Sequence, residues 1–110
     1  MISIEMHNEI LAGLRGNKSI KKVLLFGSYA RGIPGPESDI DIVIITDSQG
    51  VHSTYAQMQE DRNKISSLLM ETRKRVPMDI VVYTDKEWQL VHNDPSDFIR
   101  TIDREAIQLL

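Results

Sequence analysis

The sequence predicts an α/β (α+β) fold in which a small mixed β-sheet of three to four strands is flanked by helices. Short β-branched apolar runs are typical of buried strands, and longer segments with apolar residues at helical spacing are typical of packed helices. Their order is helix, strand, loop, strand, helix, strand, helix, which favours a layered arrangement. The 110 residues contain no repeat and no long linker, so we expect a single domain over residues 1–110.

A helix and a buried strand are expected first. Apolar side chains recur at helical spacing at Met6, Ile10, Leu11 and Leu14. Gly16 follows them and predicts the end of the helix. The apolar run Val23–Phe26 predicts the first strand, and residues 28–32 are long enough for only a turn or two of helix. The Pro-Gly-Pro segment 34–36 cannot continue a helix and predicts an exposed loop.

The middle of the chain predicts two strands with a helix between them. Residues 39–45 (DIDIVII) are β-branched and apolar after two acids, which indicates a second strand. Between Tyr55 and Val76 the apolar residues lie near one helical face, so we expect one long amphipathic helix that ends at Pro77. Residues 78–83 (MDIVVY) predict a third strand.

The last part of the sequence predicts two further helices. Asp85 is a candidate N-cap for a short helix through Leu90. Ser96 or Asp97 is a candidate start for the final helix. We expect that helix to carry its apolar residues on one side: Phe98, Ile99, Ile102, Ala106, and Leu109 or Leu110.

Charge and composition narrow the possible functions. The chain has 13 Lys or Arg and 16 Asp or Glu, so its formal net charge is −3, which argues against a protein that mainly binds a nucleic-acid backbone. No cysteine is present, which excludes disulfides, thiolate metal sites and a cysteine nucleophile. No apolar stretch is long enough to cross a bilayer, and we expect a cytoplasmic protein that is not bound to a membrane.

Three acids occupy the starts of two predicted strands. Asp39 and Asp41 are two residues apart, so their side chains leave the same face of a strand. Asp79 begins the next strand and reaches the same place if the two strands are neighbours. Carboxylates held together repel unless a cation or a proton intervenes, and paired hard oxygen ligands suit Mg²⁺. Each acid taken alone equally fits an ordinary polar strand start.

Residues beside these acids are candidate phosphate ligands. Gly27 and Ser28 follow a buried strand, where a glycine lets the backbone approach a ligand closely; an ordinary loop explains the same pair. Arg31 can reach a phosphate with two hydrogen bonds or anchor the loop to an acid such as Glu37. Ser38 either orients the Asp-x-Asp turn or is only a loop residue.

The strings GSYARG (27–32), SDIDIVI (38–44) and MDIVV (78–82) together resemble the minimal nucleotidyltransferases of the polymerase-beta-like superfamily. The resemblance implies the nucleotidyltransferase fold, with ATP as the nucleotide donor and two Mg²⁺ ions. It implies that Gly27 and Ser28 grip the triphosphate and that Asp39 and Asp41 ligate the metal ions. Asp79 would share a metal and help to deprotonate the attacking hydroxyl.

The resemblance also implies a partner. Short members of this superfamily occur beside HEPN-domain proteins in toxin–antitoxin pairs, in which the nucleotidyltransferase is the antitoxin and the acceptor can be a tyrosine of the toxin. The expected reaction is therefore transfer of AMP, or another nucleotide, to a hydroxyl of a HEPN toxin. One alternative is a non-catalytic nucleotide-binding module that acts by contact. Another is an enzyme that modifies an aminoglycoside-like small molecule, which usually needs an additional helical domain.

Overall fold

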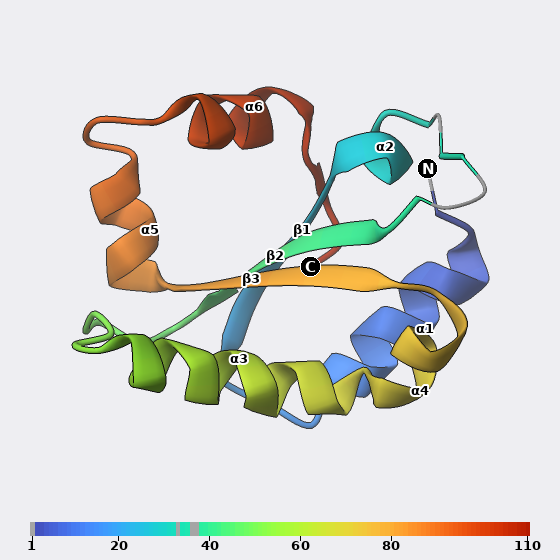
Figure 1. Ribbon diagram of the computed structural model, residues 1–110, viewed down its shortest axis with the longest axis horizontal. Coiled ribbons are helices and arrows are strands. Elements are labelled where there is room, and N and C mark those ends of the chain that lie inside the picture. The colour runs from blue at the N-terminus through green and yellow to red at the C-terminus, as the bar shows by residue number, and fades with distance from the viewer. Residues whose placement is uncertain (1, 33, 36–37) are drawn as a thin grey trace.

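A computed structural model describes residues 2–32, 34–35 and 38–110 (Figure 1). Its elements follow in the order α1 (Ile4–Leu14), β1 (Ile20–Phe26), α2 (Gly27–Ala30), β2 (Ile40–Thr46), α3 (Tyr55–Leu68), α4 (Met70–Arg75), β3 (Met78–Thr84), α5 (Asp85–Val91), α6 (Asp97–Glu105) and β4 (Ile107–Gln108). The predicted small mixed sheet flanked by helices is therefore confirmed.

The four strands form one sheet in the order β3-β2-β1-β4. The central strand β2 runs antiparallel to β1 and parallel to β3. The short strand β4 pairs antiparallel with the outer side of β1. The starts of β2 and β3 and the end of β1 therefore lie at one end of the sheet, on the right in Figure 1.

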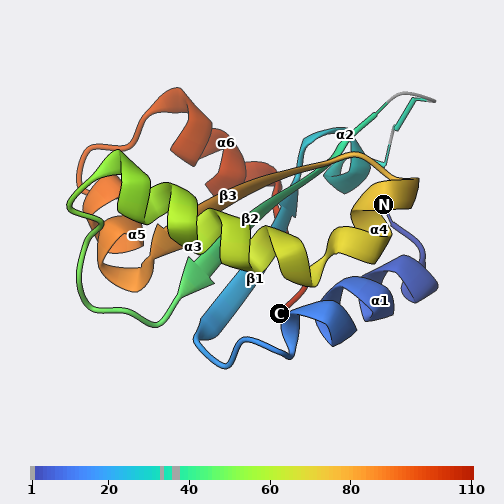
Figure 2. The same cartoon turned by 60° about the horizontal axis from the view of Figure 1, so that its bottom comes forward.

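Helices cover both faces of the sheet. Helices α1, α3 and α4 lie on one face, which Figure 2 turns toward the viewer, and α6 lies on the other. The first face buries the larger core, in which Ile42 and Ile44 pack with Ile10 of α1 and Ile65 of α3. On the second face Ile102 of α6 packs on Val43 and Ile45. Within the described ranges, no helix is both long enough and apolar enough to span a membrane.

The long helix predicted between Tyr55 and Val76 is wrong in its continuity, because it breaks at Leu69 into α3 and α4. The Leu69 N–H bonds to the Ser66 carbonyl three residues back, at 3.1 Å, so the helical ladder is interrupted. Helix α1 packs closely here, since a Cβ built on Gly13 would lie 2.9 Å from the Leu68 carbonyl oxygen. The break therefore lies where two helices meet closely.

The predicted N-cap of α5 is also wrong by one residue. Thr84, not Asp85, accepts the Glu87 N–H at 3.0 Å, and the Glu87 carboxylate accepts the Thr84 N–H at 2.8 Å. This reciprocal capping box places the helix start at the very end of β3. For α6, the cap is Ser96, one of the two predicted candidates.

The final helix is shorter than the predicted apolar pattern. Helix α6 ends at Glu105, and the chain then becomes extended at Ala106. The next two residues form β4, and the Leu109 N–H bonds to the Val23 carbonyl at 2.8 Å. Leu109 is buried in the core on the α1 face. It therefore packs against the sheet and is not part of the apolar face of α6.

Candidate active site

The strand registers bring the sequence-predicted site residues to one end of the sheet. Asp41 pairs with Phe26 of β1, directly before Gly27, and with Asp79 of β3 on its other side. Gly27 and Ser28 open the short helix α2 at that same end. Asp39 precedes β2 by one residue. Residues far apart in sequence are therefore neighbours across three strands.

The start of β2 separates buried and polar side chains cleanly. Ile40 and Ile42 are 1% and 0% exposed and belong to the core on the α1 face. Strand alternation directs Asp41 toward the opposite face, where Val43 and Ile45 pack under α6. Asp41 is half-buried and Asp39 is exposed. Burial of these isoleucines sets the orientation of β2, so that its acidic side chains point away from the core on the α1 face.

Gly27 permits a close contact with the Asp41 carboxylate. Its φ is +73°, in the left-handed region that side-chain-bearing residues rarely adopt. A Cβ built on it would lie only 2.3 Å from Oδ2 of Asp41. Glycine at this position therefore satisfies both the backbone turn and the space taken by the carboxylate.

The electrostatic environment of Asp41 opposes its negative charge. Burial, followed by the charges of Asp79 and then Asp39, raises the pKa of Asp41, while the Arg31 guanidinium acts in the other direction. The three acids are thus close enough for their charges to interact. A cation placed among them would relieve this repulsion.

Asp79 turns toward a residue that sequence reasoning missed. Its Oδ1 lies 3.9 Å from Nη2 of Arg62 in α3, and its side chain is 56% exposed. Next to it a cleft of about 190 Å³ runs between α3 and β3, lined in part by Met58, Gln59 and Arg62. In the described part of the chain, no three His, Cys, Asp or Glu side chains stand close enough together to hold a metal ion. Asp39, Asp41 and Asp79 therefore do not form a ready metal cage, and Asp79 is instead next to Arg62.

The remaining predicted ligands have identifiable contacts. Arg31 extends from the end of α2, and its Nη1 lies 3.6 Å from Oε2 of Glu105. Glu37, the partner expected from the sequence, lies outside the described residues, as does Pro36 of the predicted loop. The Ser38 hydroxyl oxygen accepts the Gly35 N–H at 2.7 Å, directly before Asp39 in the chain.

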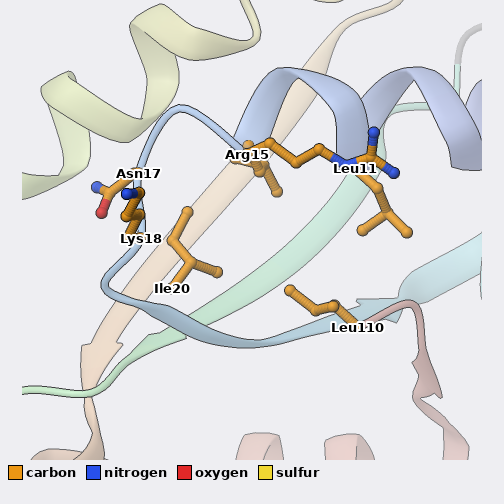
Figure 3. Close-up of a pocket in the computed structure, with 7 residues that line it drawn as sticks. Leu11, Arg15, Asn17, Lys18, Ile20 and Leu110 are labelled. Atoms are coloured by element: carbon orange, nitrogen blue, oxygen red, sulfur yellow. The ribbon is translucent and has the colours of Figure 1, made fainter.

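A separate hollow lies away from these residues. It is found at the C-terminal end of α1, where Leu11, Arg15, Asn17, Lys18, Ile20 and Leu110 line it (Figure 3). None of the predicted site residues borders it. Arg62 and Glu105, the two contacts that sequence reasoning missed, lie on helices whose polar pattern gave no sign of their spatial neighbours.

The chain is similar to one protein family and to two curated proteins. The family model described as polymerase beta, nucleotidyltransferase matches residues 8–105. Protein MJ0604 of Methanocaldococcus jannaschii is 54% identical over 43 residues, which are 39% of this chain and 41% of that protein. Protein MJ1379 of the same organism is 35% identical over 77 residues, 66% of this chain and 74% of that protein. Both proteins are named as protein adenylyltransferases, an activity that their names assign provisionally. The matched segment spans less than half of the first relative.

Solved structures share the fold. A toxin–antitoxin crystal structure with AMP-PNP matches with a TM-score of 0.59 and 24% identity, over 94% of this chain and 72% of that chain. A tri-AMPylated Shewanella oneidensis HEPN toxin in complex with MNT antitoxin matches with a TM-score of 0.51 and 22% identity, over 94% and 68%. With the family model and the second relative, the conclusion is direct: the chain belongs to the polymerase beta nucleotidyltransferase family.

Proposed function

We propose that the protein is a Mg²⁺-dependent nucleotidyltransferase that transfers AMP from ATP to a hydroxyl of a partner protein such as a HEPN toxin. The observation that carries the proposal is the meeting of Gly27, Asp41 and Asp79 at one end of the sheet. Family membership supports nucleotidyl transfer, and the names of the two relatives support a protein acceptor. ATP as the donor agrees with the AMP-PNP in a structure of the same fold.

The residues at this end of the sheet fit magnesium. Carboxylate oxygens are the ligands that Mg²⁺ takes from proteins, together with phosphate and water. Asp41 has a raised pKa because of burial and its two acidic neighbours, which is the environment that a bound cation would stabilise. Asp39 and Asp41 would hold the two ions proposed from the family, with Asp79 joining after it leaves Arg62. When bound, the ions would neutralise charge on the attacking and leaving oxygens.

The chain's own residues would bind the substrates and move one proton. The backbone N–H groups at the turn that opens α2 would face phosphate oxygens, and the hydroxyl of Ser28 would donate to them. Arg31, whose backbone N–H bonds to the Gly27 carbonyl at 3.2 Å, and Ser38, directly before Asp39, would be further phosphate contacts. A bond would form between the acceptor oxygen and the α-phosphorus while the bond from that phosphorus to the leaving pyrophosphate breaks. Asp79 would accept the proton of the acceptor hydroxyl.

A HEPN toxin is the partner that the structural likeness favours. One structure with this fold is of an MNT antitoxin in complex with a tri-AMPylated HEPN toxin. Our proposal transfers that arrangement to this chain as the antitoxin of such a pair, acting in the cytoplasm. The acceptor would then be a hydroxyl on the toxin.

Transfer of label from α-labelled ATP tests the proposal. Wild type with Mg²⁺ is compared with Asp39→Ala/Asp41→Ala in a lysate that contains the protein encoded beside this chain. We expect label on one specific protein, lost in the double variant and on chelation of the metal, and weaker label with other triphosphates. Asp47→Ala, at an exposed position directly after the far end of β2, is the control and should retain transfer.

The opposite result would identify the non-catalytic alternative. If no protein is labelled while the partner binds equally well to wild type and to the double variant, the chain acts by contact and its acids do not carry chemistry. Label that persists in the double variant would contradict the assignment of Asp39 and Asp41.

A further inference from the structure

The outer surface around the break between α3 and α4 carries a polar hollow that the proposed chemistry does not use. It has a volume of about 400 Å³. Its lining consists of Arg62, Asn63, Ser66, Ser67, Met70 and Arg73, here called the α3–α4 hollow. Its lining residues come from both helices and follow the spacing of one helical face across the break.

The lining of the α3–α4 hollow suits a negatively charged ligand. It holds two guanidinium groups, one carboxamide and two hydroxyls, and no carboxylate. The Ser67 hydroxyl already donates to the Lys64 carbonyl at 2.7 Å, so the two arginines and the Asn63 amide are its main donors. Arginine presents several N–H groups in a fixed plane that matches carboxylate geometry.

The two arginines differ from the other cations of these helices. Three of those cations each pair closely with a carboxylate: Lys64 with Glu60, Lys74 with Glu71 and Arg75 with Glu9. Arg62 has only the 3.9 Å contact with Asp79, and Arg73 has no carboxylate within 4 Å among the described residues. The hollow therefore gathers the cations of α3 and α4 that are least neutralised within the chain.

Arg62 connects the hollow to the candidate active site. It lines both the α3–α4 hollow and the cleft beside Asp79, and its guanidinium lies next to the Asp79 carboxylate. A ligand held in the hollow is therefore adjacent to the place where the acceptor hydroxyl would lose its proton. A carboxylate bound there would also compete with Asp79 for Arg62.

We propose that the α3–α4 hollow binds an acidic segment of the protein acceptor, and so selects acceptors whose hydroxyl is flanked by Asp or Glu. Two arginines are few for a nucleic-acid backbone, whose binding normally engages many phosphates, and the chain is net negative. They are sufficient for a short acidic peptide. The identity of the occupant as the acceptor rests on the proposed function, whereas the binding of an acidic peptide does not.

Binding of a fluorescent peptide to the full chain tests this surface. The probe contains one tyrosine followed by four glutamates, and its matched peptide carries four glutamines. We expect the glutamate peptide to bind at least about tenfold more tightly, with affinity falling as salt is raised. Arg73→Glu should weaken binding about five- to tenfold, because it replaces an attraction by a repulsion.

Lys74→Glu is the control, because it makes the same charge change on the same helix outside the hollow and should leave peptide binding nearly unchanged. Equal weakening by both variants would mean general charge attraction and would overturn the proposal. So would equal binding of the two peptides, or tighter binding of a single-stranded RNA oligonucleotide than of the glutamate peptide. Amide shifts of Asn63 and Ser66 on titration should accompany binding, which locates the peptide even if a variant unfolds.

Label transfer to the same peptides separates this proposal from the proposed function. Selective binding through Arg73, with no acceptor labelled under any condition, would leave the surface intact and contradict nucleotidyl transfer. Transfer that requires Asp39 and Asp41 but ignores the glutamates and Arg73 would support the enzyme and overturn the acidic-segment proposal.

Discussion

Gly27 and Asp41 form a contact in which each residue limits the other. The glycine has a φ of +73°, and the position of a Cβ on it is already taken by the Asp41 carboxylate. We expect Gly27→Ala to destabilise the fold by about 1–2 kcal/mol from backbone strain alone. It should also displace Asp41 and abolish transfer. Urea unfolding measures the first effect, and Gly50→Ala, where a Cβ would meet only Ser48 Oγ at 3.9 Å, is the control. Equal stability of the two variants would contradict this account.

We expect the ionised Asp41 side chain to lower the stability of the metal-free protein and to be necessary for nucleotidyl transfer. Its pKa is raised by burial, Asp79 and Asp39, so the folded state binds its proton more tightly than the unfolded chain does. The ionised form therefore lowers stability above the raised pKa, and this penalty disappears below the ordinary aspartate pKa of about 4. We expect Asp41→Asn, without metal, to melt at a higher temperature than wild type at neutral pH and to be inactive. A lower melting temperature would contradict the prediction.

At the level of elements, His52 links three segments at the other end of the sheet. Its Nε2 lies 2.7 Å from Asp61 of α3 and its Nδ1 3.0 Å from Glu87 of α5. Burial alone would lower the pKa of His52, but hydrogen bonds and charge from Asp61 and Glu87 raise it. The stabilisation is therefore fully present below the unfolded pKa of about 6.5 and is lost as pH rises through the folded value.

His52→Gln should accordingly cost about 1–2 kcal/mol near pH 6, with a smaller cost in alkaline solution. The free energy of unfolding of both proteins, measured across pH, gives this difference directly. A cost that does not change with pH would show that His52 acts through packing and not through its charge.

The cap of α5 provides a test of where that helix begins. The Thr84 hydroxyl accepts the Glu87 N–H and donates to the Gly50 carbonyl at 2.6 Å, while Asp85 makes a 3.1 Å ion pair with Lys21 at the surface. We expect Thr84→Ala to destabilise the fold by about 1–2 kcal/mol and Asp85→Ala by less than about 1 kcal/mol. Chemical denaturation of both variants measures this, and the reverse order would restore Asp85 as the cap.

For the molecule as a whole, the sequence predicted most of the features that depend on local residue patterns. The three long strands and the face that Ile40 and Ile42 bury follow from β-branched runs and alternation. The break at Leu69 and the strand β4 depend on contacts between distant segments: α1 against the break, and residues 107–108 against β1. No local pattern encodes such contacts.

The candidate site divides in the same way. Motif spacing identified the three acids and Gly27, and strand registers bring them to one end of the sheet. The sequence did not reveal Arg62, because it looks like any other polar residue on the exposed side of a helix. Only the packing of α3 beside β3 brings it close to Asp79. The α3–α4 hollow also went unnoticed in the sequence, because its polar lining looks like the ordinary exposed face of a helix.

If Asp39, Asp41 and Asp79 form a magnesium–nucleotide site, calorimetric titration with a non-hydrolysable ATP analogue will detect it. Wild type, Asp41→Asn and the control Asp47→Asn are titrated with and without Mg²⁺. We predict that wild type and the control bind the analogue only with the metal, and that Asp41→Asn loses at least about tenfold in affinity. Binding that is independent of Mg²⁺, or unchanged in Asp41→Asn, would contradict the account.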